Sequence, residues 1–149
     1  MTILSVTAEA GAENIPLLRN VVAHAARNAG ISEERLYDVK LCVTEAATNV
    51  VKHAYAGEQR GAVRVDVRVV EGELEIEVAD DGRGMDPARR VEDGGYGLGI
   101  IYQLTDRSSV RTAPGSGVKV WMAFPLAEAR SDANLPWESK TSVDRYFVL

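Results

Sequence analysis

One stretch of the chain, residues 36–55, combines an apolar helical face with a row of polar side chains. Its sequence, LYDVKLCVTEAATNVVKHAY, repeats with the 3.6-residue period of an amphipathic helix. The residues expected on its packed side are Leu36, Lys40, Val43, Ala47, Val50, Val51 and Ala54. On the opposite side Glu45, Asn49 and His53 follow one another at intervals of four residues and form one stripe of neighbours. The stripe is either the solvated side of the helix or a row of functional groups.

The rest of the pattern predicts a sheet built mainly from hairpins. Strands are expected at residues 2–8, 63–69, 73–80, 110–112 and 118–124. Helices are expected at residues 13–29, 97–105 and in the central stretch, whose start Ser32 is expected to cap. Glu71 and Gly72 are expected to form the turn of the first hairpin. This order of elements predicts an α+β fold, with a mostly antiparallel sheet covered on one face by helices.

The composition is that of an ordinary globular protein of one domain. The chain has 149 residues, of which 46% are hydrophobic and 26% are charged. Its net charge of −5 lacks the basic footprint of a nucleic-acid-binding protein, so nucleic acid is not an expected partner. No run reaches the roughly 18 apolar residues that span a membrane, and the N-terminus does not resemble a signal peptide. With Cys42 as the only cysteine, we expect a cytoplasmic protein with no internal disulfide and no membrane partner.

Asp80 is notable because alternation places it on the buried face of its strand. It shares this face with Leu74, Ile76 and Val78. A carboxylate in an apolar layer needs a hydrogen-bond donor. Asp80 therefore either opens a turn, as aspartate often does, or accepts a hydrogen bond from an amino group of a ligand.

Glycines cluster on both sides of a charged stretch. The positions concerned are Gly82, Gly84, Gly94, Gly95, Gly97 and Gly99. They form either simple turns or places where backbone amides approach a ligand closely. A Rossmann site is not predicted, because no strand leads directly into Gly95. The P-loop sequence GxxxxGK[ST] is absent.

Together these segments resemble the nucleotide-binding boxes of the GHKL ATPases, which have the Bergerat fold. The N, G1 and G2 boxes correspond to Glu45-x3-Asn49 with His53, Asp80-x-Gly82-x-Gly84 and Gly95-x-Gly97-x-Gly99. The surrounding sequences TEAATNVVKHAY and GLGIIYQLTD are most similar to the anti-sigma factor serine kinases. The resemblance implies a two-layer α/β sandwich and one ATPase domain over residues 1–126. It leaves residues 127–149 as a tail that docks on the body or on a partner.

The resemblance also implies a role for each matching residue. Asn49 would bind the Mg²⁺ that bridges the phosphates of ATP, and Glu45 would act as general base on an attacking hydroxyl. Asp80 would accept a hydrogen bond from the adenine amino group. His53 would either support the site or simply pack. The other residues implied to bind ATP are Gly82, Gly84, Met85, Gly95, Gly97, Leu98 and Gly99.

Residues 85–96 would form a lid over ATP, with Arg89 and Arg90 either contacting phosphate or merely solvated. Two positions depart from the pattern of the family. Val118 stands where the family usually has a threonine whose hydroxyl helps to fix the adenine-binding aspartate, so that hydrogen bond is lost or replaced. Tyr96 stands where a basic residue often precedes the second glycine box.

The sequence leaves three functions open. The first, favoured by three boxes in the right order, is an ATP- and Mg²⁺-dependent serine/threonine kinase that phosphorylates an anti-sigma factor antagonist and sequesters a sigma factor. The resemblance suggests that this kinase is a homodimer, with Arg19 of the first helix on its protein-binding surface. The second is a nucleotide-gated module that switches partners without phosphoryl transfer. The third is an α+β domain that binds no nucleotide.

Overall fold

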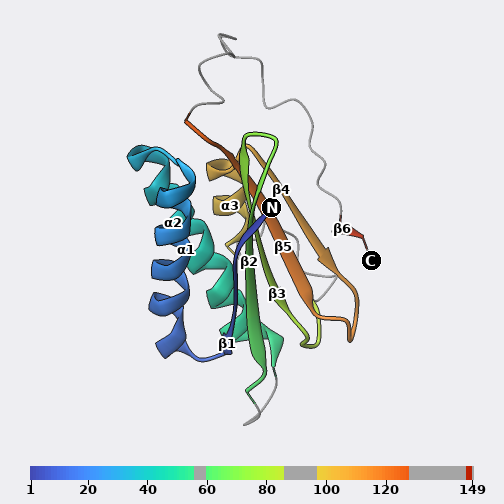
Figure 1. The fold of residues 1–149 in the computed structure, drawn as a ribbon. Helices are drawn as coiled ribbons and strands as arrows, with labels where there is room; N and C mark the ends of the chain where they lie inside the picture. The colour runs from blue at the N-terminus through green and yellow to red at the C-terminus, as the bar shows by residue number, and fades with distance from the viewer. Residues whose placement is uncertain (56–59, 86–96, 128–146, 149) are drawn as a thin grey trace.

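The protein consists of a sheet with helices on one face, as seen in Figure 1 for the computed structural model, which describes residues 1–55, 60–85, 97–127 and 147–148. The strands are β1 (Thr2–Glu9), β2 (Ala62–Val70), β3 (Glu73–Asp80), β4 (Arg107–Thr112), β5 (Val118–Pro125) and β6 (Phe147–Val148). The helices are the 3₁₀ turn η1 (Ala12–Asn14), α1 (Ile15–Ala29), α2 (Glu33–Asn49), the π-helix η2 (Val50–Ala54) and α3 (Leu98–Leu104). The predicted α+β layering is confirmed.

The strands lie in the order β1-β2-β3-β5-β4-β6. The neighbours from β1 to β4 in this order are antiparallel, and β6 alone of the described strands runs parallel to its neighbour, β4. Both predicted hairpins are present, and they meet in the centre of the sheet because β3 pairs with β5. Glu71 and Gly72 form the predicted turn, with φ values of 48° and 80°. Positive φ at both central residues matches the right-handed twist of a hairpin.

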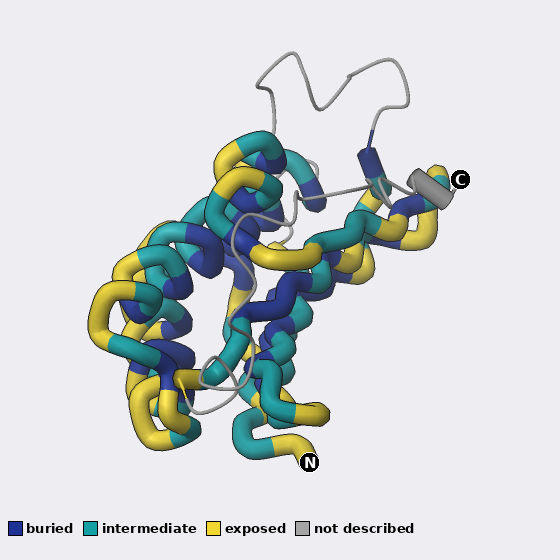
Figure 2. The backbone as a smooth tube through the Cα atoms, turned by 90° about the horizontal axis from the view of Figure 1, so that it is seen from above, coloured by how far each residue is buried: buried dark blue, intermediate teal, exposed yellow. Residues whose placement is uncertain are grey.

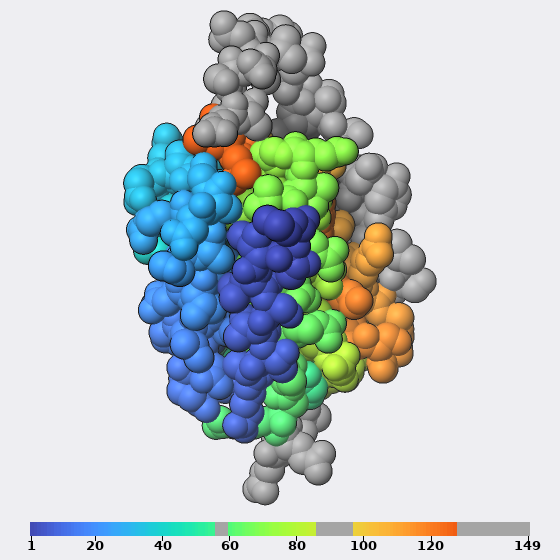
Figure 3. All heavy atoms as spheres, in the orientation of Figure 1, coloured from blue at the N-terminus to red at the C-terminus, as the bar shows by residue number. Residues whose placement is uncertain are grey.

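The core lies between the sheet and the helices, where Figure 2 shows the buried positions of both layers facing each other. Alternation along the strands places apolar side chains on this inner face. Those with at most 2% exposure are Val63, Val65, Val67, Leu74, Ile76, Val78, Val120, Met122 and Phe124. From α1 and α2 the fully buried side chains include Leu18, Val22, Val39 and Val43. At the surface α1 and β1 lie side by side (Figure 3).

Local signals explain where the two long helices begin and end. Pro16 occupies the first turn of α1, where its missing N–H is not needed. Gly30 ends α1 in the left-handed conformation, with φ of 102°. Ser32 caps α2 as predicted, because its side chain accepts a hydrogen bond from the N–H of Arg35 at 3.3 Å. No helix in the described part of the chain is long and apolar enough to cross a membrane.

The central helix differs from the prediction in its packed face. Lys40 and Val51, expected on that face, are only half-buried, whereas Val39, Cys42 and Ala46 are buried. The face is wider than a single stripe because α2 packs against α1 as well as against the sheet. The α-helix also ends at Asn49 and continues as the π-helix η2.

Two other element boundaries differ from the predicted ones. β4 begins at Arg107 instead of residue 110, because the polar residues Ser108 and Ser109 pair with β5. The first helix begins with the short turn η1 and becomes α-helical at Ile15.

Burial raises the pKa of Cys42 to about 12, with a further contribution from the charge of Asp38. The thiol therefore stays neutral in the core.

Candidate functional site

The carboxylate of Glu45 lies against the start of α3. A Cβ atom added to Gly97 would stand 2.3 Å from Oε2 of Glu45. Gly97 has a φ of 62°, in the left-handed region that favours glycine. This contact brings α2 and the second glycine box together, although a whole hairpin separates them in the sequence.

The C-terminal end of this helical segment, beyond Glu45, lies against the first glycine box. After Asn49 the chain continues as η2, whose last residue is Ala54. The carbonyl of Ala54 accepts a hydrogen bond from the N–H of Arg83 at 2.9 Å, and the carbonyl of His53 accepts one from Nε of Arg83 at 2.8 Å. A Cβ atom on Gly82 would stand 2.1 Å from the carbonyl oxygen of Ala54. The continuous helix α2–η2 therefore connects the two glycine boxes.

Asp80 ends β3 on the inner face of the sheet, with 6% of its surface exposed, as alternation predicts. Its Oδ1 accepts a hydrogen bond from the N–H of Gly82 at 2.8 Å. Burial raises the pKa of this carboxyl above its ordinary value of 3.8, hydrogen bonds from the backbone of Gly82 and Val118 lower it, and the charge of Asp81 raises it. A buried carboxylate in this environment is stabilised by any further donor that reaches it, such as the amino group of a purine.

The turn between β4 and β5, residues 113–117, closes over Asp80. Gly117 has a φ of 73°, and a Cβ atom there would stand 2.1 Å from the carbonyl oxygen of Asp80. Val118 stands where the resemblance implies a threonine, and its backbone N–H hydrogen-bonds to the carboxylate of Asp80. The side-chain hydroxyl at position 118 is absent, while a backbone donor to the aspartate is present.

Thr112 is a buried contact of this region that the sequence analysis missed. Its Oγ1 accepts a hydrogen bond from the N–H of Met85 at 2.9 Å and donates one to the carbonyl of Gly117 at 2.9 Å. A threonine at the end of a strand is common, so no pattern in the sequence marks it. Its contacts join segments that are distant in the chain.

Tyr55 and Arg83 were also missed. The hydroxyl of Tyr55 donates to the carbonyl of Ala62 at 2.6 Å and accepts from the N–H of Asp81 at 3.2 Å. Arg83 joins the loop after β3 to η2, as described above. Both residues hold the loop of residues 81–85 against the helical layer.

The remaining predicted site residues have different surroundings. Met85 and Leu98 are buried, with 6% and 4% exposure. Gly84 has a φ of 81°, and a Cβ atom there would stand 2.4 Å from the carbonyl oxygen of Ala113. A Cβ atom on Gly99 would meet nothing within 4 Å. Four predicted residues, Arg89, Arg90, Gly95 and Tyr96, lie outside the described residues.

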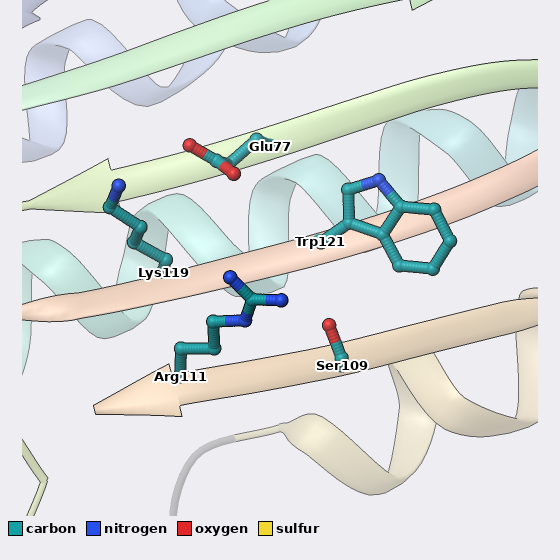
Figure 4. A pocket seen from close by; sticks show the side chains of 5 residues that line it. All are labelled: Glu77, Ser109, Arg111, Lys119 and Trp121. Atoms are coloured by element: carbon teal, nitrogen blue, oxygen red, sulfur yellow. The ribbon is translucent and has the colours of Figure 1, made fainter. Parts of the chain in front are cut away.

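A surface hollow of about 290 Å³ lies on the opposite face of the sheet (Figure 4). It is lined by Glu77, Ser109, Arg111, Lys119 and Trp121. In Figure 4 these side chains project from β3, β4 and β5 on the side away from the helix behind them. The sheet therefore separates this hollow from the inner-face carboxylate at the end of β3, and the hollow is not part of the candidate site.

We expect the raised pKa of Asp80 to make the unliganded protein less stable as pH rises. The native state binds this proton more tightly than the unfolded chain, so the free energy of unfolding falls between pH 3.8 and the raised pKa. Asp80→Asn lacks this titration. We therefore expect urea unfolding from pH 4 to 7 to show that the free energy of unfolding of the wild type declines relative to that of the variant. The contributions of the other carboxyl groups are common to both proteins and cancel in this difference. A constant difference would contradict this assignment.

Comparisons with known proteins agree with this geometry. Residues 8–124 match the family described as histidine kinase-like ATPase domain. The serine-protein kinase RsbW of Listeria innocua is 33% identical over 137 residues, covering 82% of this chain and 86% of the relative. The serine-protein kinase RsbW of Oceanobacillus iheyensis is 30% identical over 135 residues, covering 80% and 84%.

A solved structure shares the fold. The crystal structure of the RsbU and RsbW domains of a Mycobacterium tuberculosis protein matches with a TM-score of 0.66 and 18% identity, over 83% of this chain and 32% of that chain. The resemblance predicted from the three boxes is confirmed by the family match and by the curated relatives. The chain belongs to the histidine kinase-like ATPase family and, within it, to the group of serine-protein kinases named RsbW.

Proposed function

We propose that this protein transfers the γ-phosphoryl group of ATP to a serine or threonine of an anti-sigma factor antagonist and binds a sigma factor in a partner switch. The observation that carries the proposal is the placement of α2–η2. Glu45, in the interior of this helix, contacts Gly97, and Ala54, its last residue, contacts Gly82, next to Asp80. One rigid element thus sets the distance between a base-binding carboxylate and a phosphate-binding glycine box.

The base end suits adenine. Asp80 is buried beside Gly82, whose backbone comes within contact distance of Ala54. The exocyclic amino group of adenine can donate a hydrogen bond to the carboxylate of Asp80. A base without that group cannot make this hydrogen bond. Met85, in the loop that follows Asp80, adds a buried apolar side chain.

The phosphate end fits Mg²⁺. No group of three or more His, Cys, Asp or Glu within the described residues is placed to hold a metal ion by itself. Mg²⁺ prefers oxygen ligands and typically takes only one or two from protein, with the rest from phosphates and water. The half-buried Asn49, one turn beyond Glu45, offers such an oxygen. When bound, Mg²⁺ would supply positive charge that neutralises the charge developing on the phosphates.

Phosphoryl transfer requires little of the protein besides positioning. Glu45 would accept the proton of the attacking hydroxyl, and its place against Gly97 keeps it beside the glycine box. The backbone around Gly97, Leu98 and Gly99 would contact phosphate, as the resemblance implies. His53 contributes its main-chain carbonyl to Arg83, and we assign it a supporting role.

The partner surface is proposed on α1. Leu17 in its first turn is 51% exposed and Arg19 is half-buried nearby, a combination of apolar and cationic groups that suits protein binding. The two partners would compete for this surface. A cytoplasmic location and a homodimeric state complete the proposal, as the resemblance implies.

The proposal is tested by calorimetric titration of the protein with ATP and Mg²⁺. We expect binding by the wild type and a loss of affinity of about 10- to 150-fold in Asp80→Asn, because one charge-assisted hydrogen bond is replaced. Asp81→Asn is the matched control, since it changes the exposed neighbouring carboxylate and should keep its affinity.

Transfer is then measured with ATP labelled on its γ-phosphate and a candidate antagonist protein. Label on a serine or threonine of the antagonist supports the kinase. Binding of ATP and partners without transfer would instead establish the nucleotide-gated module, and no binding of ATP would overturn both.

A further inference from the structure

The hydroxyl group of Thr112 joins loop 81–85 to the β4–β5 turn. Thr112 is the last residue of β4 and is 5% exposed. It donates to the carbonyl of Gly117 and accepts from the N–H of Met85, each at 2.9 Å. A hydroxyl has one proton, so donating to Gly117 leaves its lone pairs for Met85. Both hydrogen bonds are buried, so water does not readily replace them.

The two segments also touch directly. The N–H of Gly115 donates to the carbonyl of Arg83 at 3.0 Å. A Cβ atom on Gly84 would stand 2.4 Å from the carbonyl oxygen of Ala113 and 3.1 Å from Oγ1 of Thr112. Loop and turn therefore form one packed unit in which Thr112 is the side chain that bonds to both.

This unit reaches Asp80 through one peptide group. The carbonyl of Gly117 and the N–H of Val118 belong to the same peptide, which is trans. In a trans peptide the C=O and N–H point in opposite directions, so a group that holds the oxygen also orients the N–H. The oxygen is held by Thr112, and the N–H bonds to the carboxylate of Asp80.

We propose that Thr112 is a positioning residue for adenine recognition, acting through the peptide between Gly117 and Val118 on Asp80. Its second hydrogen bond fixes the backbone of Met85 in the loop that follows Asp80. The inference rests on the proposed function, in which Asp80 binds adenine.

The test compares ATP with ITP, in which an oxygen replaces the amino group that Asp80 would bind. Calorimetry is carried out on the full chain as wild type, Thr112→Val and Thr112→Ser. We expect Thr112→Val to bind ATP about tenfold more weakly and ITP within about twofold of the wild type, so that the preference for ATP falls. Thr112→Ser keeps the hydroxyl and should keep the preference. Should Thr112→Val not fold, Thr112→Ala is measured in its place.

The matched control is Thr105→Val. Thr105 is similarly buried, at 2% exposure, and its hydroxyl donates to the carbonyl of Ile101, in the last turn of α3, at 2.6 Å. The Thr105→Val variant should have a lower thermal stability but the same ratio of affinities for ATP and ITP as the wild type. A wild-type preference for ATP that persists in Thr112→Val, or that Thr105→Val lowers equally, would overturn the role of Thr112 and leave the proposed function standing. A wild type that binds neither nucleotide would overturn the proposed function and the inference with it.

Discussion

Glu45→Gln is expected to slow phosphoryl transfer by a factor of about 100 to 10,000 while leaving ATP affinity within about twofold. Glutamine has the size of glutamate but does not accept the proton of an attacking hydroxyl. It also fits the position against Gly97, where a larger side chain would not. The measurement is single-turnover transfer of labelled phosphate to the antagonist, with ATP affinity determined separately by calorimetry.

Glu34→Gln is the control for this experiment. Glu34 lies in the first turn of the same helix and is exposed, so the substitution removes an equal charge without touching the site. It should transfer phosphate at the wild-type rate. If Glu45→Gln also transfers at that rate, Glu45 is not the general base.

Gly82→Ala is expected to destabilise the fold by about 1–3 kcal/mol and to weaken ATP binding by at least tenfold. The new Cβ would stand 2.1 Å from the carbonyl oxygen of Ala54, and a backbone atom cannot move aside as the end of a side chain can. The loop must shift, and the hydrogen bond from Gly82 to Asp80 shifts with it. Urea unfolding and ATP calorimetry on the same preparation measure both effects.

Gly99→Ala provides the contrast in stability. A Cβ atom at Gly99 meets nothing within 4 Å, and Gly99 lies in the first turn of α3, where alanine is compatible with the helix. We expect this variant to be at least as stable as the wild type. If Gly82→Ala has the stability and the ATP affinity of the wild type, the backbone at Gly82 does not lie in tight contact with the carbonyl of Ala54.

The elements that the sequence predicted most accurately are those specified by local chemistry. The alternation of β2 and β3 placed Asp80 on the inner face, and the structure buries it there. The end of the first helix at residue 29 and the cap at Ser32 were also predicted correctly, because caps depend on a few adjacent residues. The predicted roles of Glu45 and Asn49 in catalysis and metal binding stay predictions.

Tertiary structure decided the features that depend on contacts between distant segments. The polar start of β4 became a strand only because β5 lies beside it. The change from α- to π-helix after Asn49 accompanies hydrogen bonds from Arg83 to the carbonyls of His53 and Ala54, which no local pattern encodes.

The sequence by itself determined the element order, the buried face of each strand and the three glycine and carboxylate motifs, because periodicity and turn chemistry act over a few neighbouring residues. The tertiary structure alone brought Glu45 to Gly97, Gly82 to Ala54 and Thr112 to Gly117. These approaches depend on strand order and backbone spacing across the fold. Hydrogen bonds and van der Waals contacts act over a few ångströms in space, whatever the separation in the chain.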